Sequence, residues 1–294
     1  MRAKIHDFSH WTEPVNFDIL ATKTDGVIMK ASQGNYLPDH SFPGYWANAA
    51  KHNMIGGHYH YYDPGINPHS QALYYYEVTR AVGASKSDFP PILDVEMPPF
   101  VSAHIHETLE EISSLFNRKP MVYTSPSVWG SMGILSWSKD YPLWVAQYPF
   151  KEKLLQYIPL YDAMNPWLPI GFNTWKIWQC AGDLPGSTWG ATGSMDYNLF
   201  NGTLDELKAW VGKPVLLPLP KIELPLAVVL EGGLRVRSRP STLGIVLGSL
   251  NKGAVVQYAA TTQKGSNIWL AIMQNELIGW SAMTYNGVPL LRTL

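Results

Sequence analysis

Two carboxylates one residue apart, Asp94 and Glu96, lie in the apolar, proline-flanked stretch PPILDVEMPP. Acids placed together in a buried strand cost desolvation and mutual repulsion, so the pair needs a reason. Alternate residues of a strand point to one face, which predicts that both carboxylates project together, with Cα atoms about 6.6 Å apart. Such a pair is suited to general acid catalysis. The structural alternative is a pair that nearby arginine or lysine side chains neutralise.

Two further acids occupy similar positions in the sequence. Asp7 follows AKI at the end of an expected first strand, and Asp196 lies in GSMDYNLF at the end of an expected last strand. Because the first and last strands of a closed barrel are neighbours, Asp7 and Asp196 should approach each other beside the central pair. Four carboxylates around one mouth would raise some pKa values and lower others, as acid catalysis requires.

The elements that must position these acids alternate between strand-like and helix-like segments up to about residue 210. Strands alternating with crossover helices predict a parallel sheet, and this number of them predicts a closed α/β barrel of the TIM type. The second half is poorer in helix and richer in Pro, Gly and Trp, so we expect an irregular (β/α) barrel. The expected strands include GVIMKAS, IGGHYHYY, FPPILDVE, PMVYTS, YPLWVAQY and WKIWQCAG, and the expected helices FPGYWANAAKHN, HSQALYYYEVTRAVG and HIHETLEEISSLFNR.

The composition is that of a folded globular chain. It has 294 residues, of which 46% are hydrophobic and 15% charged. The net charge of −1 gives no electrostatic case for nucleic acid or an anionic membrane surface as a partner. Twelve Trp and sixteen Tyr exceed the usual need of a core, and aromatic platforms for sugar rings are one explanation, with a large aromatic core as the other.

A change of composition marks a boundary after residue 212. We expect a barrel domain over 1–212, a proline-rich linker over 213–227 and a small all-β domain over 228–294. The last part reads as short strands split by turns, such as LRVRSRPS, NIWLAIMQ and IGWSAMTYNGVPLL, with the size of a five- to six-stranded barrel.

Other chemistries have little support in the sequence. The pairs His58/His60 and His104/His106 lack a third ligand at suitable spacing, so we predict neither a metal nor a cofactor. The single cysteine, Cys180, excludes an intramolecular disulfide and is expected to be a buried thiol. No G-x-S-x-G elbow or phosphate-binding loop is present.

Several stretches together resemble glycoside hydrolase family 25, the lysozymes that cut peptidoglycan between N-acetylmuramic acid and N-acetylglucosamine. They follow one another in order over about residues 1–211: DFSHW, GHYHYYDP, PPILDVE, VYTSPSVW, PLWVAQY, and WKIWQCAG followed by GSMDYNLF. The resemblance implies an irregular (β/α) barrel and a reaction that retains the anomeric configuration. Two positions depart from the family pattern: Cys180 stands where tyrosine is common, and Gln33 where many members carry glutamate.

The resemblance also implies roles for the acids. Glu96 matches the proton donor, Asp94 its partner, and Asp7 and Asp196 the acids that tune this pair. Whether Asp94 is a covalent nucleophile or assists the 2-acetamido oxygen of the substrate stays open. The expected substrate-binding residues are Tyr59, His60, Tyr61, Trp144 and Gln147.

The C-terminal part resembles bacterial SH3-like domains, which implies binding to a cell-wall polymer or stem peptide. Tyr258, Trp269, Trp280 and Tyr285 are candidates to line a peptide or glycan groove. For the two tryptophans, the core of a small barrel is an equally good explanation.

The start MRAKIHDFSHW lacks the apolar run of a signal peptide, and no later run is long enough to span a bilayer. We therefore expect a protein made in the cytoplasm, the host cytoplasm if it is phage-encoded, that acts on bacterial peptidoglycan as a phage endolysin. Alternatives are a bacterial autolysin exported by another route, a non-catalytic glycan-binding module and a chitin-type hydrolase.

Overall fold

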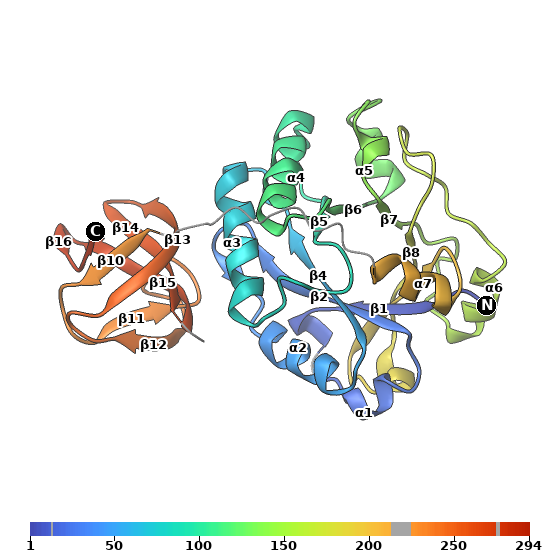
Figure 1. Ribbon diagram of the computed structural model, residues 1–294, viewed down its shortest axis with the longest axis horizontal. Helices are drawn as coiled ribbons and strands as arrows, with labels where there is room; N and C mark the ends of the chain where they lie inside the picture. Colours follow the sequence, from blue (N-terminus) through green and yellow to red (C-terminus); the bar gives the residue numbers. More distant parts are fainter. Residues whose placement is uncertain (13, 213–224, 275–276) are drawn as a thin grey trace.

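The computed structural model describes residues 1–12, 14–212, 225–274 and 277–294. Eight strands of the first part form a closed barrel in the order β1-β9-β8-β7-β6-β5-β4-β2, and β2 pairs with β1 to close the ring (Figure 1). These strands are β1 (Lys4–Phe8), β2 (Gly26–Gln33), β4 (Ile55–Tyr61), β5 (Ile92–Asp94), β6 (Met121–Thr124), β7 (Leu143–Ala146), β8 (Ile177–Pro185) and β9 (Ser194–Phe200). The predicted closed barrel is confirmed. A short strand, β3 (Leu37–Pro38), pairs with the end of β2.

The last barrel strand runs against its neighbours. β9 is antiparallel to both β8 and β1, so the prediction of an all-parallel sheet is wrong at this point. The reason lies in the connection: the eight residues between β8 and β9 hold only the 3-10 turn η4 (Gly186–Trp189). A parallel return needs a crossover of a dozen residues or more, whereas a short connection produces a hairpin.

Helices cover the first half of the barrel and become short in the second, as expected. Each of α2 (Phe42–Lys51) and α3 (Pro68–Ala81) has a proline in its first turn, where a missing N–H costs nothing, and Asn117 in the left-handed conformation ends α4 (Ser102–Phe116). After β6 the helical segments are α5 (Pro126–Gly130), η2 (Ser138–Asp140), η3 (Leu155–Tyr157) and α6 (Ile158–Tyr161). Before β2 the chain forms η1 (His10–Thr12) and α1 (Phe17–Leu20), and after β9 it forms α7 (Leu204–Val211) with a Thr203/Glu206 capping box.

Two sets of buried side chains line the two faces of the barrel wall. The inner set includes Ile5, Ile28, Ile92, Met121 and Ile177, while the alternate residues of the same strands pack outward against the helices. On β1, β2, β5 and β8 the inward row changes from apolar to polar toward the carboxyl end of the strand, whereas on the antiparallel β9 it is polar near the amino end. The polar ends of these rows meet at one mouth of the barrel.

A second, antiparallel sheet follows residue 224. Its order is β12-β11-β15-β14-β13-β10-β17, with β16 paired to β15. The strands are β10 (Leu226–Val229), β11 (Leu234–Arg237), β12 (Val246–Leu250), β13 (Val255–Lys264), β14 (Asn267–Gln274), β15 (Leu277–Tyr285), β16 (Val288–Pro289) and β17 (Leu291–Thr293). Residues 213–224 of the expected linker lie outside the described residues. β10 begins at Leu226, inside the segment expected to be linker, and the described strands exceed the five or six expected.

The second sheet packs against the barrel part. β13 and β14 contact α3, and β15 contacts β3. The sheet lies on the α3 side of the barrel part (Figure 1). No described helix is long and apolar enough to cross a membrane.

Phe89 fills the inside of the barrel below the polar mouth. It has no exposed surface, and Gly57 on β4 leaves the space that its ring needs: a Cβ added at Gly57 would lie 2.8 Å from Phe89 side-chain atoms. We expect Gly57→Ala to lower the free energy of unfolding by about 1–3 kcal/mol, because the crowded core must shift. Chemical denaturation measures this. Gly130→Ala is the control, since its added Cβ meets open space, and an equal loss in both variants would contradict the packing argument.

Candidate active site

Three of the four predicted acids continue the inward rows of the barrel. Asp7 lies two residues after Ile5 on β1, and Asp94 two residues after Ile92 on β5. Asp196 stands directly opposite Asp7 in the β1–β9 register. The predicted approach of Asp7 and Asp196 is therefore present, although Asp196 lies near the start of β9, because that strand runs in the opposite direction.

Glu96 differs slightly from the prediction. β5 ends at Asp94, so Glu96 follows the strand instead of sharing it. The backbone stays tied to β6 between them, since Val95 N–H donates to the Tyr123 carbonyl at 2.9 Å and the Thr124 hydroxyl donates to the Val95 carbonyl at 3.0 Å. Both acids thus remain at the carboxyl end of β5.

Asp7 is held by two side-chain amides. Asn198 donates to its Oδ1 at 2.7 Å, and Gln179 donates to its two oxygens at 2.9 and 3.2 Å. Burial raises the pKa of Asp7 well above its usual value, and the charge of Asp196 raises it further. Asp7 is therefore held in place by hydrogen bonds, and its raised pKa favours the protonated form.

Asp196 binds the same amide from the other side. Gln179 donates to its Oδ2 at 3.3 Å, and the Asp183 backbone N–H donates to its Oδ1 at 2.7 Å. Burial raises the pKa of Asp196 to about 6, although the Asp183 N–H opposes the rise. Gln179 is in turn fixed by the hydroxyls of Tyr123 and Tyr148, which donate to its Oε1 at 2.7 and 2.5 Å.

Asp94 is the most isolated of the four acids. Its residue is 4% exposed, and its buried Oδ1 has no hydrogen-bond partner among the described residues. Burial raises the pKa of Asp94 well above its usual value, the charge of Glu96 adds to the rise, and Lys30 lowers it. An unpartnered buried carboxylate oxygen is able to accept a hydrogen bond from a group that reaches it.

Glu96 combines solvent contact with partial desolvation. The residue is exposed, whereas the atoms around its carboxyl remove part of the water from it. This desolvation raises the pKa of Glu96, the charge of Lys30 lowers it, and Asp196 raises it. A carboxyl that retains its proton and reaches solvent is suited to donate that proton to an incoming molecule.

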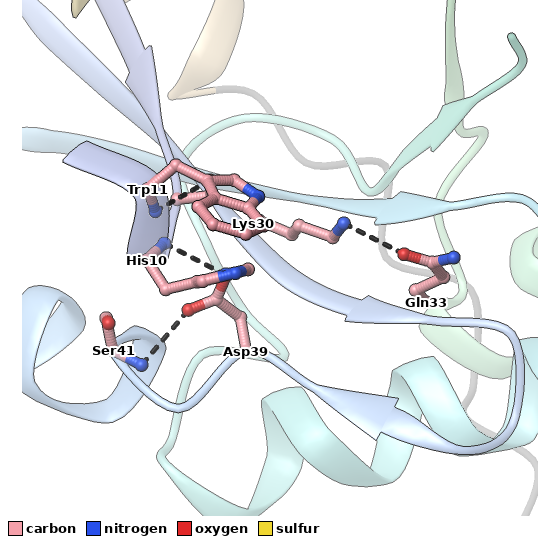
Figure 2. A network of polar contacts seen from close by, with 7 residues as sticks. His10, Trp11, Lys30, Gln33, Asp39 and Ser41 are labelled. Atoms are coloured by element: carbon pink, nitrogen blue, oxygen red, sulfur yellow. Dashed lines mark hydrogen bonds and ion pairs between the residues drawn. The ribbon is translucent and has the colours of Figure 1, made fainter. Parts of the chain in front are cut away.

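Lys30, on β2, supplies a positive charge beside the acids that the sequence analysis missed. The residue is 9% exposed, and its ammonium donates to Gln33 Oε1 at 3.1 Å (Figure 2). The ammonium nitrogen lies 4.6 Å from the centre of the Tyr61 ring. Burial lowers the pKa of Lys30, and the charges of Asp94, Asp39 and Glu96 raise it. The alternative reading, in which a nearby arginine or lysine neutralises Asp94 and Glu96, therefore holds in part. One lysine does not balance four carboxylates.

The five predicted substrate-binding residues fall in different places. Tyr61 lies beside the acids. Burial raises the pKa of its phenol to about 12, and the negative charges of Glu96 and Asp94 contribute to this rise. Tyr59 and Trp144 are inward residues below the mouth, with ring centres 6.3 Å apart, and the Trp144 indole donates to Asn198 at 2.8 Å. Gln147 is partly buried, and its backbone N–H donates to the Gln179 carbonyl at 3.1 Å.

His60 faces the wrong side of the wall to touch a substrate at the mouth. It has no exposed surface, shares a hydrogen bond with Ser32 at 2.9 Å and stacks on Tyr75. Burial lowers its pKa to about 3, so it is a neutral core histidine. The structure therefore does not place His60 where a substrate-binding residue was expected, because strand alternation turns it outward while Tyr59 and Tyr61 point inward.

The remaining histidines of the two H-x-H pairs, and Cys180, make hydrogen bonds or ring contacts within the protein. His58 is buried and contacts the Tyr75 hydroxyl and the Ala84 carbonyl. His104 and His106 lie near the start of α4, where His104 bonds the Tyr62 hydroxyl and His106 stacks on Trp137. Cys180 is buried, which raises its pKa, and its thiol donates to the Tyr197 carbonyl at 3.4 Å.

A polar brace at the end of β1 holds an exposed tryptophan. Asp39 accepts from the His10 backbone N–H at 3.1 Å, from its ring at 2.7 Å, and from the Ser41 backbone N–H at 3.0 Å (Figure 2). Trp11, 82% exposed, lies with its ring centre 4.4 Å from that of His10. An exposed indole held in this way offers a flat apolar face to a sugar ring.

His10, Asp39 and His40 also bring ligand atoms within 4.8 Å of one another. A metal ion there would have to displace the N–H groups that already use both Asp39 oxygens. The observed contacts therefore fit a structural brace better than a metal site.

The sequence missed Lys30, Gln179 and Asn198 as residues of the site. Each lies two residues along the strand from an inward-facing residue: Ile28, Ile177 and Asp196. Strand alternation applied to every barrel strand, instead of to the acids alone, would have found all three. Together they place one cation and two amides among four carboxyls, an arrangement able to donate a proton and to stabilise positive charge nearby.

Comparison with known proteins gives consistent results. The family model "Glycosyl hydrolases family 25" matches residues 6–186. The chain is 30% identical over 216 residues to the uncharacterized protein YegX of Escherichia coli (strain K12), covering 70% of this chain and 72% of that protein. It is 26% identical over 221 residues to "Lysozyme M1" of Streptomyces globisporus, covering 69% of each.

A solved structure shares the fold. The catalytic domain of endolysin ply40 from bacteriophage P40 of Listeria monocytogenes has a TM-score of 0.58 and 19% identity, with 72% of this chain and 98% of that chain covered.

The raised pKa of Asp196 makes stability depend on pH. Its carboxyl is stabilised in the protonated form on folding, so this contribution is complete below the ordinary pKa of 3.8 and is lost as the pH rises through about 6. Asp196→Asn, which cannot ionise, should therefore gain stability relative to wild type between pH 4 and 7, by up to about 3 kcal/mol. Chemical denaturation across this range measures the difference, and a difference that does not change with pH would contradict the assignment.

Proposed function

This chain belongs to glycosyl hydrolase family 25, and from that premise we propose that it is a lysozyme, a 1,4-β-N-acetylmuramidase. In this proposal it hydrolyses the bond between N-acetylmuramic acid and N-acetylglucosamine in bacterial peptidoglycan with net retention. The observation that carries the proposal is the group of Glu96, Asp94, Asp7 and Asp196 at one mouth of the barrel, with Lys30 among them. A non-catalytic glycan-binding module would gain nothing from a desolvated proton donor.

Glu96 performs the first step as general acid. Its carboxyl gives a proton to the glycosidic oxygen while the bond from that oxygen to C1 of the muramic acid breaks, and the N-acetylglucosamine side leaves as an alcohol. Its partial desolvation supports this role, because the same environment raises its pKa and keeps the proton in place at the start.

Asp94 acts on the positive charge that develops at C1. It either attacks C1 directly, or accepts a hydrogen bond from the acetamido N–H while the acetamido oxygen attacks; its buried, unpartnered Oδ1 suits both. Glu96, now ionised, removes a proton from water, and the water oxygen forms a bond to C1 while the bond from C1 to Asp94, or to the acetamido oxygen, breaks and its electron pair returns to that oxygen. Two inversions at C1 leave the configuration retained. Asp7 and Asp196, tied through Gln179, set the charge around this pair.

The substrate contacts that we favour are those at the mouth. Tyr61 lies beside Glu96 and Asp94, whose charges act on its phenol, and Trp11 offers an exposed platform at the end of β1. Tyr59 lies just below the mouth, where the charges of Asp94 and Asp7 act on its phenol. We assign Trp144 and Gln147 to the support of this site, and His60 to the core.

We assign residues 228–294 to an SH3-like domain that binds a cell-wall polymer or stem peptide. A cavity of about 280 Å³ supports this, with two arginines, a glutamate and aromatic rings among its lining residues: Glu231, Arg235, Arg237, Trp269 and Tyr285. Guanidinium groups and aromatic faces suit a short peptide that carries carboxylates. Of the predicted groove residues, Trp269 and Tyr285 line this cavity, whereas Tyr258 packs in the sheet and Trp280 is fully buried.

We further propose that the enzyme is a phage endolysin, made in the host cytoplasm and acting on the cell wall. The likeness to the catalytic domain of a Listeria phage endolysin supports this origin.

Replacement of the proton donor tests the enzymatic proposal. Glu96→Gln keeps the shape of the side chain but has no acidic proton, so hydrolysis of purified peptidoglycan should fall by about 10²–10⁴-fold. Reducing ends are converted with borohydride and identified by mass spectrometry. The control is Glu107→Gln, the same change at an exposed position on α4, which should retain full activity.

New reduced muramic acid ends in the wild-type digest are the expected outcome. Reduced glucosamine ends would instead identify a glucosaminidase. Cleavage of chitin in preference to peptidoglycan would support a chitin-type hydrolase, and the absence of new ends would support the binding-module alternative.

A charge deletion tests the C-terminal cavity. In a Glu96→Gln background, Arg235→Ala should reduce co-sedimentation with purified walls several-fold, because a guanidinium that pairs with carboxylates is lost. Arg292→Ala on β17, an exposed arginine outside the cavity lining, is the matched control. Equal binding by both variants would exclude this cavity as the wall contact.

A further inference from the structure

The second sheet meets the barrel at the strand pair that carries Lys30. β15 contacts β3, which pairs with the end of β2, and β13 and β14 contact α3. Trp280 of β15 has no exposed surface and belongs to the same buried cluster as the outer face of the barrel wall. The two parts therefore share one continuous hydrophobic core instead of meeting at an open surface.

A directional contact between described residues helps to fix this junction. The Trp280 indole N–H donates to the backbone carbonyl of Tyr36 at 2.9 Å. Tyr36 lies in the turn that joins β2 to β3, where Gly34 adopts φ +53° and donates its N–H to the Tyr61 carbonyl at 3.2 Å. Because indole N–H groups donate and do not accept, this bond sets the position of the turn relative to the sheet.

The same turn holds the Lys30 ammonium through side chains. The Tyr36 hydroxyl donates to Asp63 at 2.9 Å and accepts from the Gln33 amide at 3.2 Å. The Gln33 amide oxygen accepts from Lys30 at 3.1 Å (Figure 2). Trp280 in the second sheet is therefore connected to the ammonium group of Lys30 through the backbone and side chain of Tyr36 and the side-chain amide of Gln33.

We propose that Trp280 is a positioning residue for the reaction: by docking on Tyr36, the second sheet braces the β2–β3 turn and thereby holds Lys30 beside Glu96 and Asp94. This inference rests on the proposed function, and it gives the C-terminal sheet a role in the chemistry besides any contact with the wall.

The consequence is electrostatic. Lys30 lowers the pKa of Glu96, so a looser Lys30 leaves Glu96 protonated to higher pH, and the alkaline limb of the activity profile moves upward. The charged and titratable groups that act on Lys30 or Glu96 are Asp39, Asp94 and Asp196, together with the phenols of Tyr61, Tyr123 and Tyr148. None of these is altered by a change at Trp280.

The test uses the full chain and a soluble peptidoglycan fragment, so that wall binding does not contribute. Replacing Trp280 by 3-benzothienylalanine keeps the ring shape and removes the N–H, and Trp280→Phe and Tyr36→Phe interrupt the same series of bonds. Lys30→Met removes the positive charge completely and is the reference variant. It should shift the alkaline limb of the kcat/KM profile upward by about one pH unit or more. The Trp280 and Tyr36 variants should show a part of this shift, about half a unit, with a lower kcat.

Val229→Ala is the control for stability. Val229 is buried in the core of the second sheet and belongs to a separate cluster from Trp280, so its change weakens the sheet without touching the turn. A shift of equal size in Val229→Ala would mean that general loosening of the sheet is responsible, and would overturn the proposal.

A second readout does not need turnover. In protein labelled with ¹³C at glutamate carboxyls, the Glu96 signal, assigned by its loss in Glu96→Gln, gives the pKa of this group directly. An upward shift of that pKa in the Trp280 and Tyr36 variants supports the positioning role of Trp280. If the wild type in addition fails to cut peptidoglycan, the proposed function is refuted and the positioning role is not. An active wild type with unchanged Glu96 pKa and pH profile in these variants would refute the positioning role alone.

Discussion

The strand period of two, imposed on a closed ring of eight strands, is the constraint on which the site depends. Closure forces the inward row of every strand toward one axis, so inward residues near the same end of the ring must meet. Asp7, Lys30, Asp94 and Gln179 are such residues, and none is close to another in sequence. The wall below them is filled by apolar side chains of the same rows, which keeps the mouth poor in water from beneath.

The electrical environment of the mouth follows from this convergence. Burial disfavours the charged form of every carboxyl there, and the pKa values of Asp7, Asp94, Glu96 and Asp196 all rise for that first reason. Lys30 acts in the opposite direction on the central pair, while neutral amides hold the Asp7–Asp196 pair. The central pair, Asp94 and Glu96, is thus stabilised by a positive charge, and the Asp7–Asp196 pair by neutral hydrogen-bond donors. This difference allows the central pair to exchange protons while the Asp7–Asp196 pair keeps its position.

The sequence was most informative where the physical signal is local. Alternation of short apolar runs with amphipathic segments predicted the barrel, and the D-x-E spacing predicted that Asp94 and Glu96 lie at one strand end. The direction of β9 was not predictable in this way, because it depends on the length of its connection, which looks like any loop. His60 was misplaced because one residue of register exchanges the two faces of a wall. Lys30 was missed because a lysine inside an apolar strand looks like an ordinary polar interruption until its neighbours are known.

The pairing of β1 with β9 has a consequence for the life of the chain. Asp7 and the Asn198 amide that holds it are separated by 191 residues of sequence, so the ring closes only after nearly the whole barrel segment has been synthesised. Contacts of such high sequence separation form late in folding, because the loop must be closed before they bring any gain. Glu96 and Asp94 leave the ribosome long before their setting exists. A nascent or prematurely ended chain is thus chemically incomplete, and competence to cut arrives with the closure of the barrel.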